Sequence, residues 1–127
     1  MKNLNKLYWL KKEVAQIEEQ IKELTILSAV QMSGMPSGSS VNSPVEQFYT
    51  RLDKLRTKLE KAKAKVAKER DSLESYIEAI DDSEIRVLAR ERYVECKSWE
   101  VIGREHHMDR TTVSKKLKRF FGKDEEH

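Results

Sequence analysis

The sequence contains few of the residues that interrupt helices or cross-link chains. Its 127 residues include two prolines, four glycines and one cysteine, and aromatic residues make up only 7%. A lone Cys96 excludes an intrachain disulfide. Neither a signal-peptide-like segment nor an apolar run of about 18 residues is present, so we expect no membrane span and a cytoplasmic protein.

Charged residues, in contrast, are abundant in the sequence. Charged residues make up 37% of the chain and apolar residues 38%, which favours exposed helices over a thick core. We therefore expect an all-α protein. The formal net charge of +3 is too small to indicate a nucleic-acid partner by itself, so the distribution of charge along the chain has to decide.

The first periodic segment runs from about residue 3 to residue 32. Its apolar residues alternate at steps of three and four, the seam of a helix that packs along another: Leu7, Leu10, Val14, Ile17, Ile21 and Leu24. Residues 33–44 are small, polar or helix-breaking and predict a flexible loop. The loop ends at Ser43, Pro44 and Glu46, a pattern that indicates a capping box at the start of a helix.

A second periodic segment continues to residue 80, with the charged Glu69 on its seam. The seam residues are Val45, Phe48, Leu52, Leu55, Leu59, Ala62, Val66, Glu69, Leu73, Tyr76 and Ile80. The loop allows the two helices to fold back, so residues 1–80 are predicted to form a long antiparallel helical hairpin, a coiled coil. A hairpin leaves the longer second helix half uncovered, which predicts a homo-oligomer formed through it.

Three shorter helices are predicted after the hairpin, within residues 81–123. Asp81, Asp82 and Ser83 are all N-cap candidates for a helix that begins near Glu84 and ends near Glu95. The inward positions of this helix are Ile85, Leu88, Ala89 and Tyr93.

Ser98 caps the next helix, whose inward positions are Trp99, Val101 and Ile102, with Gly103 allowing close approach. Asp109 caps the last, whose inward residues are Val113, Leu117 and either Phe120 or Phe121. This spacing predicts a helix-turn-helix with a leading helix, followed by an acidic tail over residues 124–127.

The outward face of the last predicted helix, residues 110–121, is the candidate DNA-binding site. Residues 110–123 contain six cations and no acid. Phosphates attract such a face whatever the sequence, while short side chains allow Lys115 to reach guanine and a threonine methyl to touch thymine. The predicted DNA-binding residues are Arg110, Thr111, Thr112, Ser114, Lys115, Lys118 and Arg119.

Each of these patterns also has a simpler interpretation. The cationic last helix could be an ordinary solvent-exposed surface. The basic residues from Lys54 to Arg70 could be the solvent-exposed face of a coiled coil or a second DNA contact. His106 and His107 lack further ligands at metal-binding spacing and indicate an ordinary turn, so no metal site and no cofactor are expected. Cys96 has no paired base, and no phosphate loop or catalytic constellation occurs, so we expect no enzyme and no catalytic residues.

Residues 81–121, about the last third of the chain, resemble region 4 of bacterial sigma-70-type factors. The matching residues are Arg86, Val87, Leu88, Arg92, Tyr93, Ser98, Trp99, Ile102, Thr112, Val113 and Leu117. Cys96 and His107 stand where that pattern commonly has glycine, so both turns are expected to be slightly altered. Threonines replace the usual acidic or arginine base readers. With the helical N-terminal part, the whole chain is similar to small prophage-encoded regulators of Gram-positive bacteria of the ArpU and RinA types, which implies control of phage gene expression.

Two functional hypotheses follow from these patterns. The first is a non-enzymatic, sequence-specific regulator of transcription that binds double-stranded DNA in the major groove. The alternative is a sigma-like interaction module that docks on RNA polymerase or on a phage partner through the hairpin. Salt dependence separates them, because only phosphate contacts make affinity fall steeply with salt.

Overall fold

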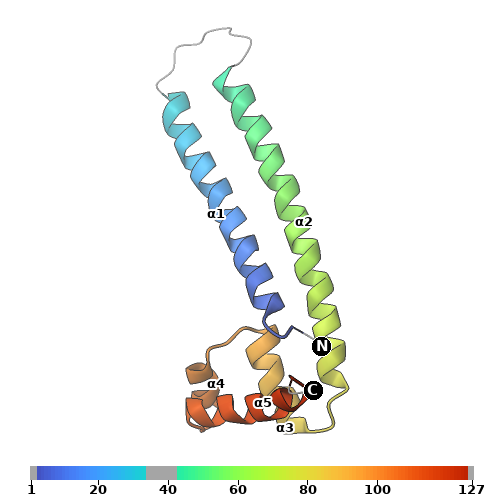
Figure 1. Cartoon of the computed structure of the whole chain (residues 1–127). Helices are drawn as coiled ribbons and strands as arrows, with labels where there is room; N and C mark the ends of the chain where they lie inside the picture. Colours follow the sequence, from blue (N-terminus) through green and yellow to red (C-terminus); the bar gives the residue numbers. More distant parts are fainter. Residues whose placement is uncertain (1–2, 34–42, 126–127) are drawn as a thin grey trace. The chain divides into compact units, whose positions relative to one another are not determined.

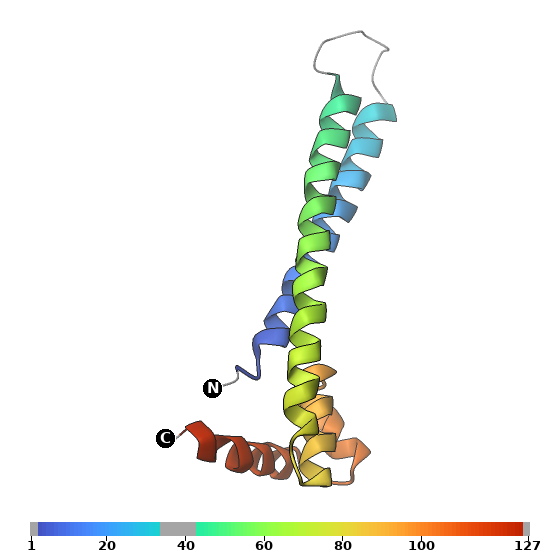
Figure 2. The ribbon, with the colours of Figure 1, turned by 90° about the vertical axis from the view of Figure 1, so that its right-hand side faces the viewer.

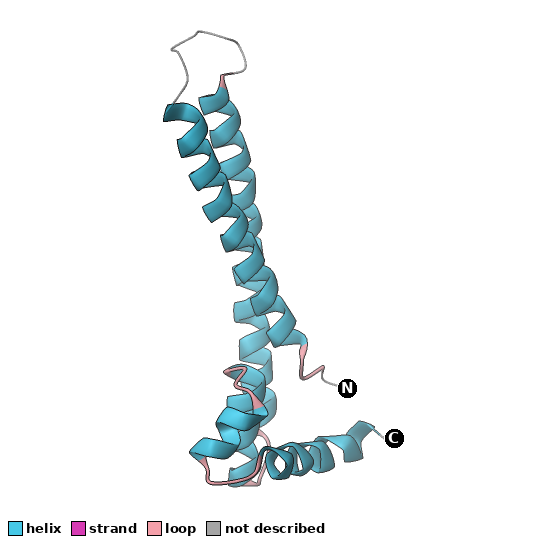
Figure 3. Ribbon diagram, turned by 90° about the vertical axis from the view of Figure 1, so that its left-hand side faces the viewer, coloured by secondary structure: helices cyan, strands magenta, loops and turns pink. Residues whose placement is uncertain are grey.

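The computed structural model describes residues 3–33 and 43–125, and all regular structure within these ranges is helical (Figures 1 and 3). In chain order the elements are α1 Lys6–Ser33, α2 Pro44–Glu78, α3 Ser83–Ala89, a π-helical segment η1 Arg90–Val94, α4 Trp99–Glu105 and α5 Arg110–Glu125. The all-α prediction is confirmed. Most of the predicted loop over 33–44 lies outside the described residues, as do residues 126 and 127 of the predicted acidic tail, whose first two residues belong to α5.

Local capping residues define where α2, α3 and α4 begin. Ser43, Asp82 and Ser98 each precede one of these helices and accept a hydrogen bond from a first-turn backbone N–H, at 3.2, 2.9 and 3.2 Å respectively. Each bond satisfies a backbone donor that the helix itself cannot pair. The predicted caps of these three helices are therefore confirmed, and of the three candidates before α3 it is Asp82 that caps the helix. Asp109, the predicted cap of α5, accepts a hydrogen bond from the Thr111 hydroxyl at 2.8 Å instead.

The chain divides into two compact units. Leu10–Lys65 is one unit, and the other joins Met1–Trp9 to Val66–His127. This division differs from the boundary at residue 80 that the sequence suggests. The end of α2 belongs with the C-terminal helices because Leu73 and Ile77 are buried in their core.

The unit Leu10–Lys65 is a two-helix antiparallel hairpin, as predicted (Figures 1 and 2). Ile17 on α1 and Leu52 on α2 are each 5% exposed, and most other seam residues are half-buried. Val45 departs from the predicted seam, because at the first turn of α2 its side chain is 46% exposed. Ser28 is buried four residues beyond Leu24, so the seam of α1 continues with a small polar residue.

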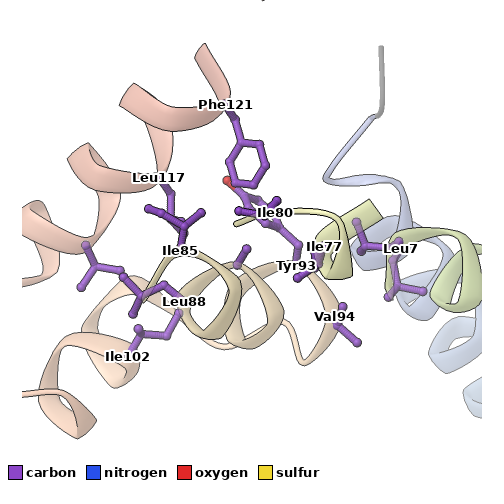
Figure 4. Close-up of a cluster of buried hydrophobic side chains, with 13 residues drawn as sticks. Leu7, Ile77, Ile80, Ile85, Leu88, Tyr93, Val94, Ile102, Leu117 and Phe121 are labelled. Atoms are coloured by element: carbon purple, nitrogen blue, oxygen red, sulfur yellow. The ribbon is translucent and has the colours of Figure 1, made fainter. Parts of the chain in front are cut away.

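The second unit has a continuous apolar core (Figure 4). Its buried members are Leu7, Leu73, Ile77, Ile80, Ile85, Leu88, Ala89, Tyr93, Val94, Ile102, Val113, Leu117 and Phe121. Phe121 is the inward phenylalanine, at 5% exposure, whereas Phe120 is 37% exposed. Ile77 is fully buried although it lies off the predicted heptad seam, because this part of α2 packs against α3, η1 and α5 as well as the start of α1.

Charged contacts hold the start of α1 and the segment η1 against the end of α2. Glu69, which interrupts the apolar seam, is only 8% exposed, and its carboxylate lies 3.7 Å from Lys6 Nζ. Arg90 of η1 pairs with Glu74 at 3.0 Å and with Glu78 at 2.7 Å. Hydrogen bonding to Glu74 raises the pKa of the Arg90 guanidinium.

Two turns in this unit place a non-glycine residue in the left-handed backbone region. Cys96 follows η1 with φ of 59°, and His107 follows α4 with φ of 54°. After α4, the Met108 N–H donates to the Gly103 carbonyl at 2.7 Å, which is the Schellman arrangement with His107 at the position that glycine usually occupies. A side chain with a Cβ is strained in this conformation.

Substituting His107 by glycine is therefore expected to stabilise the protein. Removing the strain should contribute more than the extra unfolded-state entropy of glycine costs, a net gain of about 0.5–1 kcal/mol. Chemical denaturation measures this gain as a higher midpoint with an unchanged slope. His107→Ala is the matched control, because it removes the imidazole but keeps the Cβ and should bring no gain. Equal stability of the two variants would contradict the explanation from backbone strain.

Candidate nucleic-acid interface

The residues that the sequence analysis assigned to DNA binding spread over about 200° around the axis of α5. Val113, Leu117 and Phe121 are buried at steps of four, so they attach the opposite face of the helix to the core. Lys115 and Arg119 point most directly away from the buried side, whereas Arg110 and Ser114 lie next to it. Ser114 is half-buried, and the rest are exposed: Arg110, Thr111, Thr112, Lys115, Lys118 and Arg119.

The cations of this face differ in whether the protein itself neutralises them. Lys116 is half-buried, and its Nζ lies 2.8 Å from Glu84 Oε1 on α3. This contact makes Lys116 a structural residue that links α5 to α3. Among the described residues, Arg110, Lys115, Lys118 and Arg119 have no such acidic partner. Their four positive charges therefore face solvent, and no acid of the described residues neutralises them.

Two shallow hollows flank the exposed face, and Lys115 lines both. The hollow toward α4 has a volume of about 390 Å³ and is lined by Trp99, Arg110, Thr111, Ser114, Lys115 and Lys118. The hollow toward α3 has a volume of about 470 Å³ and is lined by Asp82, Glu84, Ile85, Thr112, Lys115, Lys116, Arg119 and Phe120. Lys115 thus lies between the two flanks, at the centre of the face.

The two flanks differ in electrostatic character. The hollow toward α3 includes the carboxylates of Asp82 and Glu84, which would repel a phosphate. The lining of the hollow toward α4 includes three cations, two hydroxyl groups and one indole but no acid. A polyanion is therefore better accommodated on the α4 side. The sequence analysis did not assign Trp99 to this surface.

The close contact between α4 and the following turn positions α5. A Cβ placed on Gly103 would lie 2.5 Å from the carbonyl oxygen of Met108 and 3.2 Å from the backbone nitrogen of Arg110. Only glycine accommodates this approach, as predicted. Trp99, at the start of α4, packs against the core and lies under the guanidinium of Arg92, whose Cζ is 4.1 Å from the ring centroid. Both contacts set the position of α4 beneath the exposed face.

The turn at the end of α4 also contains a charged cluster. Glu91, Glu105 and His106 place one potential ligand atom each within 4.8 Å of the others. The ammonium of Lys97 is 3.1 Å from Glu105 Oε2 and 3.8 Å from Glu91 Oε1, and hydrogen bonding to Glu105 raises the pKa of Lys97. His106 Nε2 lies 2.6 Å from Glu91 Oε2. The cluster therefore joins η1 to α4 through the ion pairs of Lys97 and the contact between His106 and Glu91.

Comparisons of the chain with protein-family models, with curated proteins and with solved structures found no match. Within residues 3–33 and 43–125, every long helix is too polar to cross a lipid bilayer.

Proposed function

We propose that the protein is a sequence-specific DNA-binding regulator of transcription. In this proposal α4, residues 106–109 and α5 form a helix-turn-helix, and α5 enters the major groove. The observation that carries the proposal is the single exposed face of α5. Four cations that have no acidic partner within the described part of the chain lie there beside short hydroxyl side chains, while the opposite face is anchored in the core. Cations would bind phosphates, and Thr111, Thr112 and Ser114 allow the backbone to approach base edges.

The resemblance to sigma-70 region 4 supports this proposal at two further positions. The pattern commonly has glycine where this chain has Cys96 and His107, and both residues have positive φ angles. Positive φ is the backbone region that glycine favours, so both positions are compatible with the glycines of that pattern. A control function in prophage gene expression, of the ArpU and RinA kind, would follow from the resemblance of the whole chain.

Selection of duplexes from a random pool with the full chain tests the proposal. An enriched duplex and its scrambled counterpart are then titrated at several salt concentrations. The enriched duplex should bind more tightly by a factor of about 10³ or more. Its log affinity should fall with log salt at a slope of about −3 or steeper, because at least three α5 cations contact phosphates. No enrichment after repeated rounds would contradict a sequence-specific function.

A second candidate function is protein docking through the hairpin. The observation that favours it is a set of exposed apolar side chains in the unit Leu10–Lys65: Ile26, Leu27, Val30, Val45 and Tyr49. Such side chains mark protein contacts, with RNA polymerase, a phage protein or a second copy of the chain as partner. Binding of this kind would depend little on salt, in contrast to DNA binding.

A further inference from the structure

The helix α2 carries a concentrated positive charge within the unit Leu10–Lys65. Residues 54–65 contain six cations and a single acid, Glu60, although the whole chain has a net charge of only +3. All six cationic side chains are exposed. None has an acidic partner among the described residues, so α1 does not neutralise them.

Four of these cations form one line along the helix. Lys54, Lys58, Lys61 and Lys65 follow steps of four, three and four, which keeps them within about 60° of one another around the helix axis. The seam residues Leu55, Leu59 and Ala62 are half-buried and lie about 100° away around the same helix. The lysine stripe, defined as these four lysines, therefore lies on one flank of α2, clear of the seam.

The stripe is unfavourable for the isolated helix. Lys54 and Lys58, and likewise Lys61 and Lys65, are like charges four residues apart, an arrangement that destabilises a helix. A solvent-exposed helix face does not need like charges, because alternating positive and negative side chains are equally well solvated and also stabilise the helix. A bound polyanion would offset the repulsion between these lysines, so their positive charges would favour binding.

We infer that the lysine stripe binds the phosphate backbone of duplex DNA, as a contact separate from α5 and independent of base sequence. This inference rests on the proposed function for the identity of the nucleic acid. The stripe spans about 16 Å, over which one DNA strand presents about five phosphates, so four lysines match the charge density of a strand. Lysine offers a flexible point charge that suits phosphate without selecting a base.

Two other kinds of partner fit the surface less well. Helices that bind membranes place large apolar side chains beside their cations, but no large apolar side chain is exposed between residues 50 and 65. Protein interfaces are depleted in lysine at their centres and use aromatic or aliphatic anchors, and neither kind of anchor adjoins the stripe. The stripe therefore fits a uniform polyanion.

The test compares four forms of the full chain on a random-sequence duplex, titrated at several salt concentrations. The stripe variant carries Lys58→Gln, Lys61→Gln and Lys65→Gln. The control variant carries Arg56→Gln, Lys63→Gln and Arg70→Gln, which removes the same charge from exposed positions on the opposite side of α2. A third variant carries alanine at Arg110, Lys118 and Arg119 of α5.

The stripe variant should bind the random duplex at least about tenfold more weakly than the control variant, with a salt slope shallower by about three. Its preference for an enriched over a scrambled duplex should persist, because that preference belongs to α5. Its melting temperature should not fall, which shows that the hairpin remains folded. Equal binding by the stripe and control variants would overturn the inference while leaving the proposed function intact.

Other outcomes separate the two proposals. Weak binding by the stripe variant together with unchanged binding by the α5 variant would support the stripe and overturn the function proposed for α5. Absence of duplex binding by the unsubstituted chain would overturn both. Stronger stripe-dependent binding to an RNA duplex, or to vesicles that contain phosphatidylserine, would overturn DNA as the source of the phosphates.

Discussion

Replacing Lys115 by alanine is expected to lower affinity for the enriched duplex by about 1–3 kcal/mol and to relax its preference over a scrambled duplex. Lys115 lines both hollows beside α5 and has no acidic partner among the described residues, so it is placed to reach a base edge. Lys118 lies nearly one turn further along and lines only the hollow toward α4. Lys118→Ala should therefore weaken binding to all duplexes alike and make the salt slope shallower by about one.

Lys116→Ala provides the matched control for these two variants. It removes the same charge from the neighbouring position, but this lysine already pairs with Glu84. Its loss should alter duplex preference little. The three variants are titrated with the enriched and the scrambled duplex at several salt concentrations. Equal weakening of both duplexes by Lys115→Ala would make Lys115 a phosphate contact. Unchanged affinities for Lys115→Ala and Lys118→Ala would mean that this face does not meet DNA and would favour protein docking.

The second large effect is expected at Gly103. An alanine methyl there would lie 2.5 Å from the backbone oxygen of Met108, and that oxygen belongs to the turn rather than to a flexible side chain. The turn and the start of α5 would have to move away from α4, so we expect Gly103→Ala to lower the free energy of unfolding by about 3 kcal/mol. Thermal melting should show a loss of more than about ten degrees.

Gly122→Ala is the matched control for this substitution. It makes the same chemical change within α5, where a Cβ would have no neighbour within 4 Å. Because alanine favours a helix more than glycine does, this variant should be as stable as the original protein or more stable by up to about 1 kcal/mol. Similar melting temperatures for the two alanine variants would show that the approach at Gly103 is not as close as described.

Local signals in the sequence were sufficient to predict the helices and the starts of α2, α3 and α4. Ser43, Asp82 and Ser98 act on backbone groups only two or three residues away, so their effect does not depend on the rest of the fold. The spacing of apolar residues likewise predicted the hairpin and the buried faces of α3, α4 and α5. The exposed face of α5 was predicted for the same reason, because burying Val113 and Leu117 turns Lys115 outward.

Contacts between distant residues decided what the sequence left open. Phe120 and Phe121 are equivalent in helical periodicity, and the stacking of Phe121 with Tyr76 and its edge-to-face contact with Tyr93 select Phe121 for the core. The division into compact units also depends on such contacts, because Ile77 leaves the heptad pattern to pack against the C-terminal helices.

The partners of charged residues likewise cannot be predicted from the local sequence. Lys116 and Lys115 are neighbours of the same type, yet only Lys116 meets Glu84, which is 32 residues away in the chain. The sequence by itself therefore determined which helices form and which side of each is apolar, since both depend on neighbours within a few residues. Only the tertiary structure decided which cations remain unneutralised, because that depends on where acids from other helices come to lie.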